Sequence, residues 1–153
     1  MQVGPNQKRD SEILQGINAV LSKDDFDRIV EDLRRNQKWH RQDVEKFWAL
    51  RDFMSEDENE FASDRLRDGA DGLHRAVQKM IDFSARHFFV CDRHFKTVGG
   101  EFLYRLYPRL QEKIAAGDTK AQALWDGHLV TLIKLCGDLK RSYGEFQRAT
   151  NVL

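Results

Sequence analysis

From Trp125 to Phe146, apolar side chains recur at steps of three and four residues, which is the spacing of one face of an α-helix. The chain of 153 residues contains only two prolines, Pro5 and Pro108, and no run of β-branched residues. Proline breaks the interior of a helix, whereas runs of β-branched residues favour strands. We therefore expect an all-α protein.

Further amphipathic stretches precede this helix, and together they predict an antiparallel bundle. Apolar residues recur at helical spacing from about Ser11, again after the N-cap signal at Ser22, and again from Val44. The Gly117-Asp118 pair predicts the end of one helix and the N-cap of the last. We predict a single domain over residues 1–153, with four main antiparallel helices and an N-terminal helical extension, in which residues 1–8 are disordered.

The central part of the sequence predicts the longest apolar stripe. Ser55-Glu56-Asp57-Glu58 has the form of a capping box and predicts the start of a helix. From there the stripe continues through His87 and Cys91 to Phe95, as one helix or as two separated near Gly69 and Gly72. Gly99-Gly100 predicts a break, and Pro108 either kinks the next helix or starts its second part.

Charge and composition exclude several classes of function. The 25 Lys and Arg residues balance 25 Asp and Glu residues, which argues against a protein that wraps nucleic acid or lies on an anionic membrane. No apolar run approaches the roughly 18 residues that a membrane span needs, and no signal peptide is recognisable. The two cysteines, Cys91 and Cys136, suit a reducing compartment. We expect a cytoplasmic protein without a cofactor.

Candidate metal ligands lie in the second half of the chain. His87, Cys91 and His94 stand at positions i, i+4 and i+7, so a helix through them would present all three on one face. His128 or Cys136 from the last helix would complete a tetrahedral site. Alternatively, His87 and Cys91 pack in the core, because the usual CxxC or HxxxH spacing is missing. A metal-binding or hemerythrin-like sensor bundle is therefore one alternative function.

Enzymatic motifs are few. Arg35-Asn36 to His40 matches the Arg-x4–6-His motif of helical ribonucleases of the HEPN class, in which both residues meet at a dimer interface. Arg34 to His40 and Arg67 to His74 match the same motif, so it decides little. No Ser/His/Asp arrangement, P-loop or GxGxxG motif is present. We expect a protein that is not an enzyme, with a HEPN-like ribonuclease as the second alternative.

Acidic residues gather in one segment at Glu56, Asp57, Glu58, Glu60 and Asp64. Such a run is typical of a helix N-terminus, where the helix dipole favours negative charge. The run is also suited to docking a basic partner, because it forms a local acidic face on a chain whose net charge is zero. Both interpretations stay open at this point.

Three segments of the C-terminal half carry a resemblance to a known family. They are Ser84 to Arg93, Leu106-Tyr107-Pro108-Arg109-Leu110, and Leu132 to Tyr143. In the same order they are similar to three signatures of the Rsd/AlgQ family, bacterial anti-sigma regulators that bind the sigma-70 factor of RNA polymerase. Arg86 replaces a glycine of the family pattern and Cys91 a tyrosine.

This resemblance implies a non-enzymatic regulator of bacterial transcription that binds a protein and makes no direct contact with nucleic acid. Its expected partner is region 4 of sigma-70, a basic helix-turn-helix element that a helical bundle can cover with an apolar and acidic face. We expect the partner to be contacted by Glu56, Asp57, Glu58, Asp92 and Arg93. We expect the bundle to be braced by His87, Phe88 and Pro108.

Overall fold

The computed structural model describes residues 4–90 and 102–153, and in these residues the chain forms six α-helices and three short strands. The all-α prediction is confirmed, since the strands form only one small sheet. The elements are α1 (Pro5–Val20), α2 (Lys23–Asn36), β1 (Lys38–His40), α3 (Arg41–Ser55), the 3-10 turn η1 (Asp57–Asn59), α4 (Asp64–His87), β2 (Phe88–Val90), β3 (Leu103–Leu106), α5 (Pro108–Ala115) and α6 (Thr119–Thr150).

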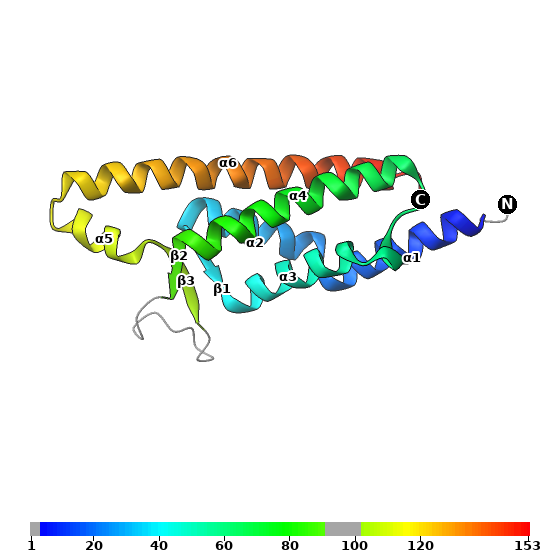
Figure 1. The fold of residues 1–153 in the computed structure, drawn as a ribbon, viewed down its shortest axis with the longest axis horizontal. Coiled ribbons are helices and arrows are strands. Elements are labelled where there is room, and N and C mark those ends of the chain that lie inside the picture. The colour runs from blue at the N-terminus through cyan, green and yellow to red at the C-terminus, as the bar shows by residue number, and fades with distance from the viewer. Residues whose placement is uncertain (1–3, 91–101) are drawn as a thin grey trace.

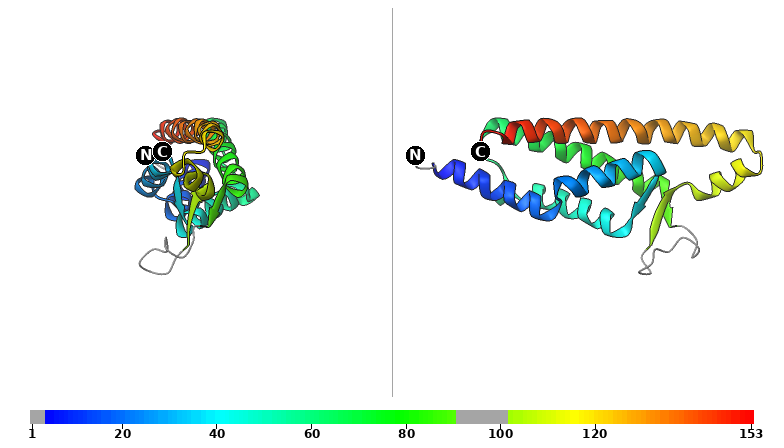
Figure 2. Two further views of the ribbon diagram at one scale, coloured as in Figure 1. Left: turned by 90° about the vertical axis from the view of Figure 1, so that its left-hand side faces the viewer. Right: turned by 180° about the vertical axis from the view of Figure 1, so that it is seen from behind.

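Helices α4 and α6 run side by side along the length of the molecule, and α1, α2 and α3 pack beneath them (Figures 1 and 2). The buried faces are the predicted ones, because in α2 the fully buried side chains are Phe26, Ile29, Val30 and Leu33. In the helices of the described residues, none combines the length and the apolar character that a membrane crossing requires.

Helices α2 and α6 begin where a polar side chain accepts hydrogen bonds from the free backbone N–H groups of the first turn. Ser22 accepts a hydrogen bond from the Asp25 backbone N–H, and Asp118 accepts from the N–H groups of Lys120 and Ala121. Gly117 between α5 and α6 has a φ of 89°, a left-handed conformation that favours glycine. Residues 5–8, predicted to be disordered, form the first turn of α1, because proline suits the first position of a helix.

The start of α4 differs from the prediction. Ser55 begins no helix. Instead η1 follows, and α4 begins at Asp64 with Ser63 as its N-cap. The Ser55 hydroxyl donates to the Arg51 carbonyl oxygen, which is the i−4 bond that closes α3. The predicted capping box is therefore wrong, because its serine belongs to the preceding helix.

The end of α4 also differs. The helix ends at His87, and Phe88–Val90 form strand β2, so the predicted helical continuation toward Phe95 is wrong. Residues Leu103–Leu106, predicted to be helical, form β3, and Pro108 starts α5. The sheet order is β1-β3-β2 with antiparallel pairing. Trp39 and Val90 both lie opposite Tyr104, which places these three side chains on one face of the sheet.

Candidate functional site

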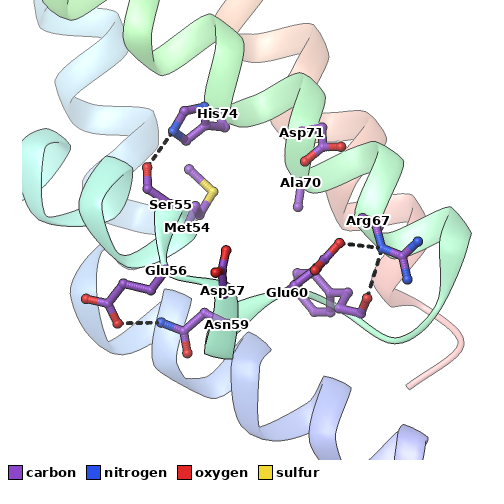
Figure 3. A pocket seen from close by; sticks show the side chains of 11 residues that line it. Met54, Ser55, Glu56, Asp57, Asn59, Glu60, Arg67, Ala70, Asp71 and His74 are labelled. Carbon is purple, nitrogen blue, oxygen red and sulfur yellow. Dashed lines mark hydrogen bonds and ion pairs between the residues drawn. The ribbon is translucent and has the colours of Figure 1, made fainter.

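A cleft of about 200 Å³ lies between the α3–α4 connection and one face of α4 (Figure 3). The connection places the carboxylates of Asp57 and Glu60 on the side that faces α4. The wall of the cleft is formed by Met54, Ser55, Glu56, Asp57, Asn59, Glu60, Phe61, Arg67, Ala70, Asp71 and His74. The structure therefore brings two predicted partner-binding residues, Glu56 and Asp57, into one cavity with Asp71. We call it the acidic cleft.

A buried carboxylate from α1 fixes the connection. Asp10 is 2% exposed, and its two oxygens accept hydrogen bonds from the backbone N–H groups of Ala62 at 2.7 Å and Ser63 at 3.1 Å. Beside it, the Arg9 guanidinium donates to the Glu60 carbonyl oxygen at 3.0 Å. The backbone between η1 and α4 is thus held by side chains from a helix more than fifty residues earlier in the chain.

Arg67 closes one end of the acidic cleft. Its guanidinium donates to the carbonyl oxygens of Phe61 at 3.2 Å and Ala62 at 3.3 Å. The same group forms ion pairs with Glu60 and Asp64, each at 3.1 Å. Because these four acceptors already share the guanidinium, Arg67 leaves the other carboxylates of the cleft without a cation.

Two carboxylates from outside the cleft wall, Glu58 and Asp52, crowd Glu56. The pKa of Glu56 is raised, first by a hydrogen bond to the Glu58 side chain, then by partial desolvation and by the negative charges of Glu58 and Asp52. Among the described residues, Asp57, Glu58 and Asp71 form no ion pair with a lysine or arginine. The connection therefore presents negative charge that no lysine or arginine of the described residues neutralises, and a cation placed there would stabilise the ionised form of Glu56.

His74 forms the other end of the acidic cleft. Its Nε2 lies 2.9 Å from the Ser55 Oγ. The single hydroxyl proton of Ser55 is donated to the Arg51 carbonyl, so the His74 Nε2–H must be the donor in this bond. Asp71 and His74 were not predicted as residues of a binding site. The sequence feature that could have identified them is the spacing of Arg67, Asp71 and His74, because it places all three on one polar face of α4.

His87 joins three elements at the opposite end of α4. Its Nδ1 lies 2.6 Å from the Tyr107 hydroxyl, and its ring lies 4.7 Å from that of His128 on α6. Phe88 is 6% exposed and packs edge-on against Trp39, and Pro108 provides the first turn of α5. His87, Phe88 and Pro108 thus lie together at this end of α4, and their role in bracing the bundle stays a prediction.

The helical face of three metal ligands is not formed. Because α4 ends at His87 and a strand follows, the prediction that one helix continues from His87 through Cys91 and His94 is wrong. Cys91 and His94 lie outside the described residues, as do the predicted partner contacts Asp92 and Arg93. Within residues 4–90 and 102–153, no group of three His, Cys, Asp or Glu side chains is arranged to hold a metal ion.

Cys136 does not join His128 in a metal site. Both residues are on α6, where eight residues correspond to about 12 Å along the axis. Cys136 is buried, and burial raises the pKa of its thiol to about 12. With no exposed surface, Cys136 is one of the residues of the hydrophobic core.

Of the residues that match the ribonuclease motif, Arg35 and His40 lie near the sheet, whereas Arg67 and His74 lie in the acidic cleft. Arg35 is in the last turn of α2, where it forms an ion pair with Glu31. His40 ends β1 and stands at the N-cap position of α3, without a side-chain cap bond. The guanidinium of this pair is therefore already engaged with a carboxylate.

The pKa of His87 provides a test of its bracing role. This pKa is lowered, first by burial and then by the charges of His128 and Arg86. The unfolded chain therefore binds a proton at His87 at higher pH than the folded chain does. We expect the free energy of unfolding to fall as the pH drops from about 6.5 toward the lower pKa of the folded state. Urea denaturation across this range should show a smaller fall in His87→Gln, whereas His74→Gln should retain it. Equal falls in wild type and His87→Gln would contradict the prediction.

No protein-family model matches the chain, and no curated protein and no solved structure matches it either. The acidic cleft is therefore interpreted from its own geometry and charge.

Proposed function

We propose that this chain is a regulatory protein that binds a basic partner protein through the acidic cleft. The observation that carries the proposal is the gathering of Glu56, Asp57 and Asp71 in the wall of one cleft, where none of them forms an ion pair with a lysine or arginine of the described residues. Repulsion from Glu58 and Asp52 adds to this at Glu56 and raises its pKa. Among the described residues of the cleft wall, Arg67 is the only arginine, and it is already shared among four acceptors. A lysine or arginine of a partner would relieve this repulsion, so that association gains free energy from charge complementarity.

The partner that we propose to test first is region 4 of bacterial sigma-70. The resemblance of three C-terminal segments to the Rsd/AlgQ family supports this choice. Region 4 is a basic helix-turn-helix element, and its charge complements that of the acidic cleft. By occupying the surface with which region 4 holds promoter DNA, the protein would regulate transcription without catalysis.

Charge reversal in the acidic cleft should weaken this binding. We expect the triple variant Glu56→Lys, Asp57→Lys, Glu58→Lys to bind purified region 4 at least about ten-fold more weakly near physiological salt. Its affinity should also depend less on salt, because the attraction between opposite charges is lost. Titration calorimetry at low, physiological and high salt measures both effects.

A matched variant separates the cleft from overall charge. Asp24→Lys, Glu112→Lys and Glu145→Lys change the net charge by the same amount at exposed positions on α2, α5 and α6. This control should bind region 4 nearly as well as the wild type. Failure of the wild type to bind region 4 would overturn the choice of partner. Equal weakening by both triple variants would overturn the assignment to the cleft.

A further inference from the structure

An apolar pocket of about 200 Å³ lies where the small sheet packs on α3 and α4. Each strand contributes one aromatic side chain, and the two helices contribute the remainder of the wall. The lining residues are Trp39, Val44, Trp48, Ile81, Ser84, Ala85, Phe88 and Tyr104. The wall reaches the surface at Trp48, whose side chain is 39% exposed. This pocket is separate from the acidic cleft and shares no lining residue with it.

Trp39 lines this pocket and carries an unpaired hydrogen-bond donor just beneath its wall. Trp39 is 1% exposed, and its Nε1 is buried without an acceptor in the part of the chain that the structure describes. The ring is held by edge-on contacts with Phe47, at 5.1 Å between centroids, and Phe88, at 6.4 Å. It therefore cannot turn its N–H to solvent without breaking these contacts. Buried donors are almost always paired in proteins, so the orphan N–H of a residue that lines a pocket is a group that a ligand with an acceptor can satisfy.

The wall also determines which ligand chemistry fits. It contains no lysine, arginine, histidine or carboxylate, so a charged ligand would lose its hydration without a counter-ion. The Ser84 hydroxyl already donates to the Ile81 carbonyl oxygen. A cavity of about 150 Å³ is large enough for benzene, so this pocket has room for one aromatic ring with a small substituent.

We propose that the pocket binds a small, uncharged aromatic compound that carries a carbonyl group. The ring packs among the apolar side chains, and the carbonyl oxygen accepts the hydrogen bond of the Trp39 indole N–H. Because the Nε1 atom is buried, the oxygen reaches it only when a neighbouring wall side chain shifts. Binding should therefore also change tryptophan fluorescence, since Trp39 and Trp48 both line the pocket.

Acetophenone and ethylbenzene provide matched probes, because they differ mainly in the carbonyl oxygen. Titration of the full chain should show acetophenone binding at least about ten-fold more tightly than ethylbenzene, the difference expected for one hydrogen bond to a buried donor. Trp39→Phe keeps an aromatic ring but removes the N–H, so it should bind both probes with equal affinity. Equal affinities in the wild type, or a preference that survives in Trp39→Phe, would overturn the role of Trp39.

A second variant tests the pocket where Trp39→Phe fails to fold. Ala85 lines the pocket from an exposed position on α4, so Ala85→Leu should fill the cavity and abolish binding of both probes while the protein stays folded. Ala123→Leu on α6 is the matched control, since this alanine is also exposed and lies outside the pocket wall. It should bind as the wild type does. Absence of acetophenone binding to the wild type, or unchanged binding in Ala85→Leu, would overturn the proposed site.

Discussion

Replacing Phe26 with alanine should lower the free energy of unfolding by about 4 kcal/mol. Phe26 is 1% exposed and lies in α2 between two other helices. Its ring stacks on Tyr143 of α6, with centroids 4.1 Å apart, and lies parallel to Phe47 of α3 at 5.9 Å. Removing the ring leaves a cavity that these helices cannot close without shifting as units. The cost is therefore the lost free energy of burying the ring plus the free energy of the cavity left behind.

Thermal unfolding measures this effect, and a loss of about 4 kcal/mol corresponds to a fall of about 8–16 °C in Tm. Phe26→Leu retains most of the volume and should cost about 1–1.5 kcal/mol. Leu124 on α6 is 57% exposed, so Leu124→Ala should change stability by less than about 0.5 kcal/mol. A cost below about 1.5 kcal/mol for Phe26→Ala would contradict the assignment of Phe26 to the centre of the core.

The core position of Phe26 was predictable because the sequence pattern that indicates it lies within a single helix. Phe26, Ile29, Val30 and Leu33 recur at helical spacing directly after the N-cap Ser22, and all four are buried in α2. The same holds for α6, where Asp118 caps the helix. Segments that are amphipathic over several turns carry enough information for their own assignment.

The sheet was not predictable in this way. Each strand has only three or four residues, which is too short to show an alternating pattern. Its pairing joins Trp39 and Val90 to Tyr104, residues that are far apart in the sequence. Tertiary pairing therefore overrides the helical periodicity that extends past His87 in the sequence.

The acidic cleft was predictable only in part. Glu56 and Asp57 are visible as part of an acidic run, and both line the cleft. Their local structure was misassigned, because Ser55 closes α3 and takes the hydrogen bond of His74 instead of capping a new helix. The sequence pattern does not distinguish these two uses of a serine hydroxyl. That choice depends on α4, which brings His74 to Ser55 from nineteen residues away.

Replacing Asp10 with alanine should lower the free energy of unfolding by about 3 kcal/mol. The change leaves the partly buried N–H groups of Ala62 and Ser63 without their acceptors, and each such loss costs about 1–3 kcal/mol. Asp10→Asn should cost about 2 kcal/mol, since one carboxylate oxygen is replaced by an amide that faces another donor. Urea denaturation measures these costs, and Glu12→Ala, at an exposed position on the same helix, should cost less than about 0.5 kcal/mol.

Hydrogen exchange tests whether Asp10 also holds the wall of the acidic cleft. The amides of Ala62 and Ser63 should exchange faster in Asp10→Ala than overall destabilisation explains, because they lose their own acceptors. Amides in the middle of α6 should follow the global change alone. If the two loop amides exchanged no faster than those of α6, the buried carboxylate would not be what fixes the α3–α4 connection. If they do, a single carboxylate on α1 sets the position of the acidic side chains more than forty residues later in the chain.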